Sequence, residues 1–300
     1  MLAHPPPQGL TKKKTMTYII HGASGAQGGP LLKRLSAAGK NAVGAVRASE
    51  ALAATQTVRI DNASVESLVE AYRGADGVFI HLPQTDEGSR VTYARNIARA
   101  VDLAKPGRVV ISTSGIIVDE PDSPLQAPAD SAMAILIEGV RSTGVSYAVV
   151  APRLYLENLL LPMVFGPTQT EGVLRYPLRS DQPVSWSSHL DVAEVAERLF
   201  EQTSVSGVVG VGQLPGLIGK DVATGFQRHL GRDVAFESIT PQAFGAMIEP
   251  LIGPASAAIA AFYGALQSSP TNTIPHDTSA QTLFGIAPRS VEQWLGETLG

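Results

Sequence analysis

The sequence contains no cysteine among its 300 residues. Disulfide bonds, zinc–thiolate sites and a thiol nucleophile are therefore excluded, and the lack of cysteine fits a cytoplasmic location, which we expect. Basic residues are few, since 23 Lys and Arg stand against 27 Asp and Glu and give a net charge of −4. A nucleic-acid surface needs clustered Lys and Arg, so we expect no nucleic-acid partner.

Long apolar runs are also missing, so we expect no membrane span. Residues 1–15 hold three prolines and no apolar signal core. We interpret them as a disordered extension rather than a secretory signal, and expect the fold to begin at Met16. The composition of 44% hydrophobic and 17% charged residues is typical of a globular protein.

Short runs rich in Val and Ile alternate with amphipathic segments in the first half of the chain. Runs that are apolar throughout suit strands covered on both faces of a parallel sheet. The alternation predicts an α/β fold with a doubly wound parallel sheet over residues 16–152. We expect strands at 17–21, 42–46, 57–60, 77–81, 108–112 and 146–150, and helices at 27–38, 65–72, 88–104 and 130–143.

After Pro152 the pattern changes to a smaller, mixed lobe, residues 153–300. No change of composition marks a linker, so we expect the two parts to be intertwined and to form one structural unit. Residues 154–165 are strongly apolar and form a helix or a pocket wall, while the Ala-rich stretch 254–266 packs either within the lobe or between the subunits of a homodimer. Further helices are expected at 191–203, 219–230, 241–251 and 290–299, and strands at 207–211 and 233–239.

Three glycines follow the first expected strand in the pattern GxxGxxG, and a helix follows them. Glycine permits a sharp turn and the close approach of a phosphate, and the helix directs free N–H groups at the anion. In this strand–turn–helix context the pattern predicts a dinucleotide site. We expect the pyrophosphate to lie beside Gly22, Ser24, Gly25, Ala26, Gln27 and Gly28.

The ends of the next two strands bear on the choice of cofactor. Arg47 stands where an NAD site would place an acidic residue, and a guanidinium there suits the 2′-phosphate of NADP(H). The alternative is an exposed surface arginine. Asp61 follows the third strand, where it either accepts from the adenine amino group or caps the helix that starts near Ser64.

In a sheet of this kind, ligands bind beyond the carboxyl ends of the strands. The ends of the fourth, fifth and sixth strands should therefore line the cofactor. These positions are His81, Leu82 and Pro83, then Ser112, Thr113 and Ser114, and then Pro152 and Tyr155.

Several stretches together resemble the NmrA-like family, a branch of the atypical short-chain dehydrogenases/reductases. They include "IIHGASGAQG", "STSG", "APRLYLENLL", "HLDVAEVAERLF" and "GRDVAFESITPQAF", and the resemblance extends from Met16 over nearly the whole chain. It implies a Rossmann-type sheet with a small mixed α/β C-terminal lobe, a nicotinamide cofactor in the cleft and a structural role for Asp191. Members of the family include NAD(P)H-dependent quinone, imine and triphenylmethane-dye reductases, isoflavone-type reductases, and redox-sensing regulators.

The proton-transfer pair of ordinary short-chain dehydrogenases, Tyr-x-x-x-Lys, is absent, because no lysine follows a tyrosine by four positions. Many NmrA-like relatives carry a lysine four residues before the position of Glu138, where this chain has Ala134. Two hypotheses remain. The chain is either an NADPH-dependent reductase of a good hydride acceptor, such as a quinone, imine, activated carbonyl or alkene, or a regulator that binds NADP(H) without turnover.

Candidate catalytic residues are Tyr155 and His81. The alternative for Tyr155 is that it only lines the pocket, and the alternative for His81 is that it lies beneath the cofactor with its hydrogen bonds made within the protein. His189 is a further candidate, with the start of a helix as its alternative role. The substrate is expected to contact six side chains that follow the sixth strand. These are Leu154, Tyr155, Asn158, Met163, Phe165 and Trp186, and no metal is expected. Of these, Met163, Phe165 and Trp186 would form an apolar wall or would instead belong to the core of the lobe.

The assignment of Arg47 can be tested with the Arg47→Glu variant. We expect its affinity for NADPH to fall at least about tenfold, because a carboxylate would replace the cation that faces the 2′-phosphate. Isothermal calorimetry measures this, and an unchanged affinity would show that the assignment is wrong.

Overall fold

The computed structural model describes residues 16–47 and 56–300, so the extension expected at residues 1–15 lies outside the described residues. A seven-stranded sheet lies at the centre, in the order β10-β6-β5-β4-β1-β2-β3, with neighbouring strands parallel. This is the Rossmann-type arrangement that the sequence predicted. The strands are β1 (Thr17–His21), β2 (Asn41–Val46), β3 (Thr57–Arg59), β4 (Gly77–Ile80), β5 (Val109–Ser112), β6 (Tyr147–Pro152) and β10 (Gly207–Val211).

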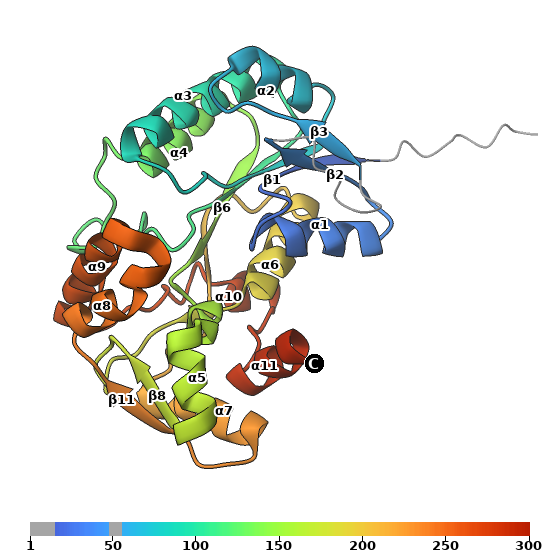
Figure 1. Ribbon diagram of the computed structural model, residues 1–300. Coiled ribbons are helices and arrows are strands. Elements are labelled where there is room, and N and C mark those ends of the chain that lie inside the picture. The colour runs from blue at the N-terminus through green and yellow to red at the C-terminus, as the bar shows by residue number, and fades with distance from the viewer. Residues whose placement is uncertain (1–15, 48–55) are drawn as a thin grey trace, which may run out of the picture.

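Helices cover both faces of the sheet (Figure 1). On one face, α1 (Gly28–Ala37) and α6 (His189–Glu201) bury leucines such as Leu31 and Leu199 against β1 and β5. On the other face, α2 (Val65–Tyr72), α3 (Glu87–Ala104) and α4 (Ala132–Ser142) form a second core that includes Leu136. Apolar layers on both faces explain why the central strands are apolar throughout.

The strand at 207–211 was expected in the second lobe, and this expectation is wrong. β10 instead pairs with β6 over the register Gly207↔Ala148 to Val211↔Pro152 and extends the main sheet. A run such as Gly-Val-Val-Gly-Val shows that a strand forms but not which strand it pairs with, because the partner lies about sixty residues away in the sequence. The chain thus returns to the first domain after it has entered the second.

The smaller lobe surrounds a third core. The expected pocket wall at 154–165 is a short strand, a 3₁₀ turn and the beginning of a helix that Pro162 opens. The lobe also contains two short parallel pairs, β7 with β9 and β8 with β11. Its elements are β7 (Leu154–Tyr155), η1 (Leu156–Leu160), α5 (Pro162–Glu171), β8 (Val173–Tyr176), β9 (Trp186–Ser187), α7 (Gly219–Leu230), β11 (Ala235–Ser238), α8 (Pro241–Ile252), η2 (Gly253–Ala255), α9 (Ser256–Ser268) and α11 (Val291–Leu299). The short helix α10 (Ala280–Phe284) instead packs on the core of the main sheet, beside β10.

One stretch contradicts the expectation that no segment is long and apolar enough to cross a membrane. Pro241–Ser268 spans 28 residues with a mean hydropathy of 1.4 in its most apolar window, so it passes by length and composition. In the structure the turn η2 divides this stretch into α8 and α9, which pack against each other at the edge of the lobe (Figure 1). The Ala-rich stretch packs against α8, while much of its own surface is exposed.

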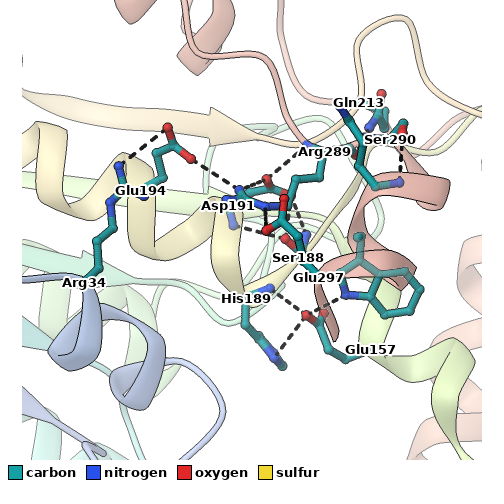
Figure 2. Close-up of polar contacts among 12 residues, drawn as sticks. Arg34, Glu157, Ser188, His189, Asp191, Glu194, Gln213, Arg289, Ser290 and Glu297 are labelled. Atoms are coloured by element: carbon teal, nitrogen blue, oxygen red, sulfur yellow. Dashed lines mark hydrogen bonds and ion pairs between the residues drawn. The ribbon is translucent and has the colours of Figure 1, made fainter. Parts of the chain in front are cut away.

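A buried carboxylate ties α6 to the chain before α11 (Figure 2). Asp191 is 1% exposed; its Oδ2 accepts from the backbone N–H of Ser188 at 2.7 Å, which closes a capping box at the start of α6. Its Oδ1 accepts from the backbone N–H of Arg289 at 3.0 Å and from Nη1 of the same residue at 2.8 Å. One side chain thus caps a helix of the main domain and holds a distant segment against it.

We expect Asp191→Ala to lower the free energy of unfolding by about 2–4 kcal/mol, because it removes the cap and leaves the Arg289 guanidinium without its buried partner. Urea unfolding measures this. The control is Glu138→Ala, which breaks an exposed pair with Arg141 on α4 and should change stability by less than about 0.5 kcal/mol. Equal effects of the two variants would contradict the role of Asp191.

Candidate cofactor and substrate site

A cavity of about 990 Å³ lies between the carboxyl ends of the sheet strands and the smaller lobe. The glycine turn and the ends of β4 and β5 contribute Ala26, Gln27, His81 and Ser114. The segment after β6 contributes a second group of predicted site residues, namely Leu154, Tyr155 and Asn158. The structure thus brings predicted cofactor and substrate residues into one space, as expected for this type of sheet.

The glycine turn permits a very close approach between α1 and the end of β1. A Cβ atom on Gly28 would lie 2.4 Å from the carbonyl oxygens of both His21 and Gly22, so only glycine fits. Gly22 has a φ of +62°, and a Cβ there would meet the His81 ring at 2.9 Å. The first turn of α1 has neither a side-chain cap at Gln27 nor an acidic residue. The positive end of the helix is therefore free of protein anions and suits a phosphate.

Gln27 fastens the glycine turn to the end of β5. Its Oε1 accepts from the Ser112 hydroxyl at 2.5 Å, and its Nε2 donates to the Ser114 hydroxyl at 3.0 Å. Ser114 has a φ of +56°, an uncommon conformation for a residue with a side chain. These bonds fix two strand ends relative to each other at the place where a dinucleotide would cross them.

A smaller hollow of about 140 Å³ lies at the ends of β2 and β3, and Arg47 and Asp61 both line it. Sequence reasoning missed two further side chains there, Arg59 and Tyr93. Asp61 does not cap α2, because the Ser64 hydroxyl does so by accepting from the backbone N–H of Ser67. The Asp61 carboxylate instead accepts from the backbone N–H of Ala63 at 2.8 Å, in the turn before the helix.

Three histidines gather where β1 and β4 end and α6 begins. Burial, with a smaller effect of His81, lowers the pKa of His21 to about 3 and that of His189 to about 4. Burial also lowers the pKa of His81, whose Nδ1 is buried without a hydrogen-bond partner among the described residues. All three imidazoles are therefore neutral at pH 7, and His21 is bonded to the Tyr72 hydroxyl at 2.7 Å.

Tyr155 lies beside this histidine group. Its ring centroid is 4.4 Å from that of His189, and its buried phenol oxygen forms no hydrogen bond of standard geometry in the described part of the chain, although the Ser112 hydroxyl lies close enough to offset part of the rise in its pKa. Burial raises the pKa of Tyr155 above its usual value, so the hydroxyl keeps its proton. A buried hydroxyl without a partner is costly and is a candidate for contact with a ligand.

Glu157 holds the start of α6 and, with it, His189 (Figure 2). The His189 ring in turn lies beside Tyr155. Its Oε1 accepts from the backbone N–H of His189 at 2.9 Å and from the indole N–H of Trp294 at 3.2 Å. The same oxygen is 3.6 Å from His189 Nδ1, but the lowered pKa of that histidine means that no ion pair forms at pH 7.

Three residues expected in the substrate wall do not line the large cavity. Trp186 is 1% exposed and packs 5.5 Å behind Tyr176, and Tyr176 is the residue that lines the cavity. Met163 and Phe165 pack on the core of the lobe, where Phe165 lies 6.2 Å from Phe226. For these three residues the structure shows the alternative role, as part of the core of the lobe.

Five residues that were predicted near the cofactor do not line the cavity either. Four of them are buried, namely Leu82, Ser112, Thr113 and Pro152, and Pro83 is partly buried.

Most of the wall that sequence reasoning missed comes from α8, α9 and the loop before α4. Its residues include Ile116, Leu125, Phe244, Ile248, Leu251, Ile252, Ile259, Phe262 and Tyr263. For the wall residues on α8 and α9, the sequence feature that could have indicated them is the low charge of 241–268, where Glu249 is the single charged residue. That pattern predicts apolar helices but not the space that they face.

Solved structures with the same fold include several reductases. Citrobacter sp. triphenylmethane reductase has a TM-score of 0.78 at 16% identity, over 95% of this chain and 100% of that one. The same enzyme complexed with NADP(H) has a TM-score of 0.76 at 16% identity, over 92% and 98%. An NADPH-dependent quinone oxidoreductase of Escherichia coli, complexed with NADPH, has a TM-score of 0.71 at 19% identity, over 95% and 100%.

At this level of identity the likeness establishes the fold. No curated protein matches the chain in sequence. The family comparison is more specific, because it matches residues 12–295 and therefore covers both the glycine turn and the second lobe. The chain belongs to the NmrA-like family.

Proposed function

We propose that the protein is a cytoplasmic NADPH-dependent reductase that transfers a hydride to a small apolar or aromatic acceptor, such as a quinone, an imine, or an activated carbonyl or alkene. Residues 16–152 bind the dinucleotide, and the smaller lobe within residues 153–300 shapes most of the acceptor site. The observation that carries this proposal is the single cavity, which joins the glycine turn to the apolar wall of the lobe. Solved structures with this fold include reductases complexed with NADP(H) or NADPH, which supports the same proposal.

The preference for NADP(H) over NAD(H) is argued from the hollow at the ends of β2 and β3. Arg47 and Arg59 both line it and both are exposed to solvent, so two guanidiniums can reach a 2′-phosphate there. Tyr93 offers an aromatic ring on the same hollow for the adenine. Asp61 lines the hollow as well, and its free carboxylate oxygen can accept from the adenine amino group.

Bound NADPH supplies a hydride from C4 of its nicotinamide. The protein's part is to place the acceptor over that carbon and to exclude water, because positioning alone supplies much of the rate when the acceptor is electrophilic. No lysine lines the cavity among the described residues. Tyr155 and His81 are our candidates to hydrogen-bond the acceptor as it gains charge, since each presents a buried polar atom that has no partner among the described residues.

A regulator that binds NADP(H) without turnover is the second candidate. The observation in its favour is Ala134, which replaces the lysine of many relatives and leaves no general acid at the usual place. The large apolar space next to the dinucleotide site argues against it, since a sensor of the cofactor alone has no use for that space.

The two candidates are separated by following the absorbance of NADPH with a panel of quinones, imines and dyes. We expect steady oxidation with at least one acceptor. Gly28→Ala should abolish it and weaken NADPH binding at least about tenfold, because the new Cβ atom would displace two backbone carbonyls of the turn.

The matched control is Gly29→Ala, where a Cβ atom would lie 3.4 Å from the Ala23 carbonyl oxygen, an ordinary contact. This variant should keep both binding and turnover. Tight binding of NADPH without oxidation of any acceptor would favour the regulator, and the absence of calorimetric heat with NADP⁺, NADPH, NAD⁺ and NADH would exclude both candidates.

The role of Tyr155 is tested with Tyr155→Phe, which should lower kcat about tenfold or more and leave NADP⁺ affinity within about twofold. Tyr147→Phe, on β6 outside the cavity, is the control and should leave kcat unchanged. An equal kcat for wild type and Tyr155→Phe would show that Tyr155 lines the cavity but takes no part in the reaction.

The pH dependence of kcat/KM gives an independent test. His189 is neutral above its lowered pKa of about 4, and the pKa of Tyr155 is raised, so neither group titrates near neutrality. We expect kcat/KM to stay level from roughly pH 6 to pH 9 and to fall only as the pH drops towards 4 and His189 gains a proton. An inflection near 6.5, the ordinary histidine value, would contradict a neutral site.

A further inference from the structure

The far end of the cavity has more apolar wall than a small acceptor needs. α8 and α9 contribute Phe244, Ile248, Leu251, Ile252, Ile259 and Phe262 to its lining. The space lined by these residues is continuous with the part lined by His81 and Tyr155, as one cavity of about 990 Å³. That volume lies at the upper end of the range for sites that hold drug-sized ligands.

Several residues that line the cavity are exposed, and three of the exposed ones are apolar and belong to this wall. Leu251, Ile252 and Ile259 line the cavity and are nevertheless 58%, 40% and 36% exposed. They form an apolar rim, which we define by these three residues. Exposed apolar side chains that adjoin a cavity mark a surface where an apolar ligand binds.

We propose, on the basis of the reductase function above, that the natural acceptor carries an apolar tail, which lies between its reducible ring at Tyr155 and the apolar rim on α8 and α9. The ring takes up the hydride from NADPH C4 and a proton from water, so NADPH is oxidised to NADP⁺ and the ring is reduced by two electrons. The tail takes no part in the reaction and contributes binding free energy.

The polar groups at this end of the cavity are consistent with a tail. Tyr176 and Tyr263 both line the space, and their hydroxyls are hydrogen-bonded to each other, so that pair does not require a polar ligand. Glu249, the single charged residue of 241–268, is exposed and does not line the cavity.

The same stretch argues against a membrane surface as the ligand of the rim. Residues 241–268 contain neither Lys nor Arg, the residues that attract a protein to anionic headgroups. The rim residues also belong to the lining of the site itself, which a docking face outside the cavity would not require.

The experiment measures the binding of three benzoquinones to the NADP⁺-loaded protein by calorimetry. They share one dimethoxy-methyl ring and carry no tail, a butyl tail or a decyl tail. Each buried CH₂ strengthens binding by up to about fourfold, so we expect the decyl compound to bind at least about 30-fold more tightly than the tailless one. Ile259→Asp and Leu251→Asp should each reduce this ratio to within about threefold.

The control is Leu103→Asp on α3, which is 52% exposed in the wild type and lies outside the cavity, and which should keep the full ratio. Equal affinity for the tailless and decyl compounds in the wild type would overturn the proposal. The proposal would also be overturned if the rim variants lost binding to phosphatidylcholine vesicles but kept the dependence of affinity on tail length, because the rim would then be a membrane-binding face.

NADPH oxidation is recorded separately with the same three compounds. Tail-dependent binding without oxidation of these compounds or of any acceptor in the panel above would refute the reductase function and leave the apolar tail site standing. Oxidation of all three compounds with equal kcat/KM and equal affinity would support the reductase and refute the tail.

Discussion

The distance between α1 and the end of β1 is the constraint on which the site depends. With carbonyl oxygens 2.4 Å from the place where a Cβ of Gly28 would stand, the helix can begin against the strand only if that residue has no side chain. This contact sets the direction of the helix axis and therefore the position of its free N–H groups. The Gln27 side chain then fixes the turn to the end of β5 through its hydrogen bonds with the hydroxyls of Ser112 and Ser114. Any ligand of the large cavity is placed relative to this rigid corner.

Around that corner the protein has assembled groups that are polar but uncharged. His21, His81 and His189 have lowered pKa values and Tyr155 a raised one, all mainly through burial. The charged residues that line the cavity are paired with carboxylates, Arg90 with Glu87 at 2.6 Å and Arg153 with Asp119 at 3.0 Å and Glu120 at 2.7 Å. A largely apolar space strengthens the few hydrogen bonds that form in it and suits an uncharged acceptor.

The sequence predicted the features that depend on neighbours along the chain. The strands of the first half, the glycine turn and helix α7 follow from local pattern, and the structure has them close to the expected residues. It did not predict features that depend on distant partners. Trp186 suits a pocket wall as well as a core, and only the packing of Tyr176 in front of it decides between the two. The apolar wall on α8 and α9 was missed for the same reason, since an apolar helix face does not reveal what lies opposite.

The return of the chain to the main sheet at β10 also affects synthesis of the protein. β6 ends at Pro152 and its outer neighbour begins at Gly207, so on the ribosome the edge of β6 stays unpaired while more than fifty further residues are made. An unpaired edge of a parallel sheet is a site of mispairing between nascent chains. The first domain therefore cannot complete its fold before much of the second has been translated, and truncation after Pro152 would leave that edge permanently open.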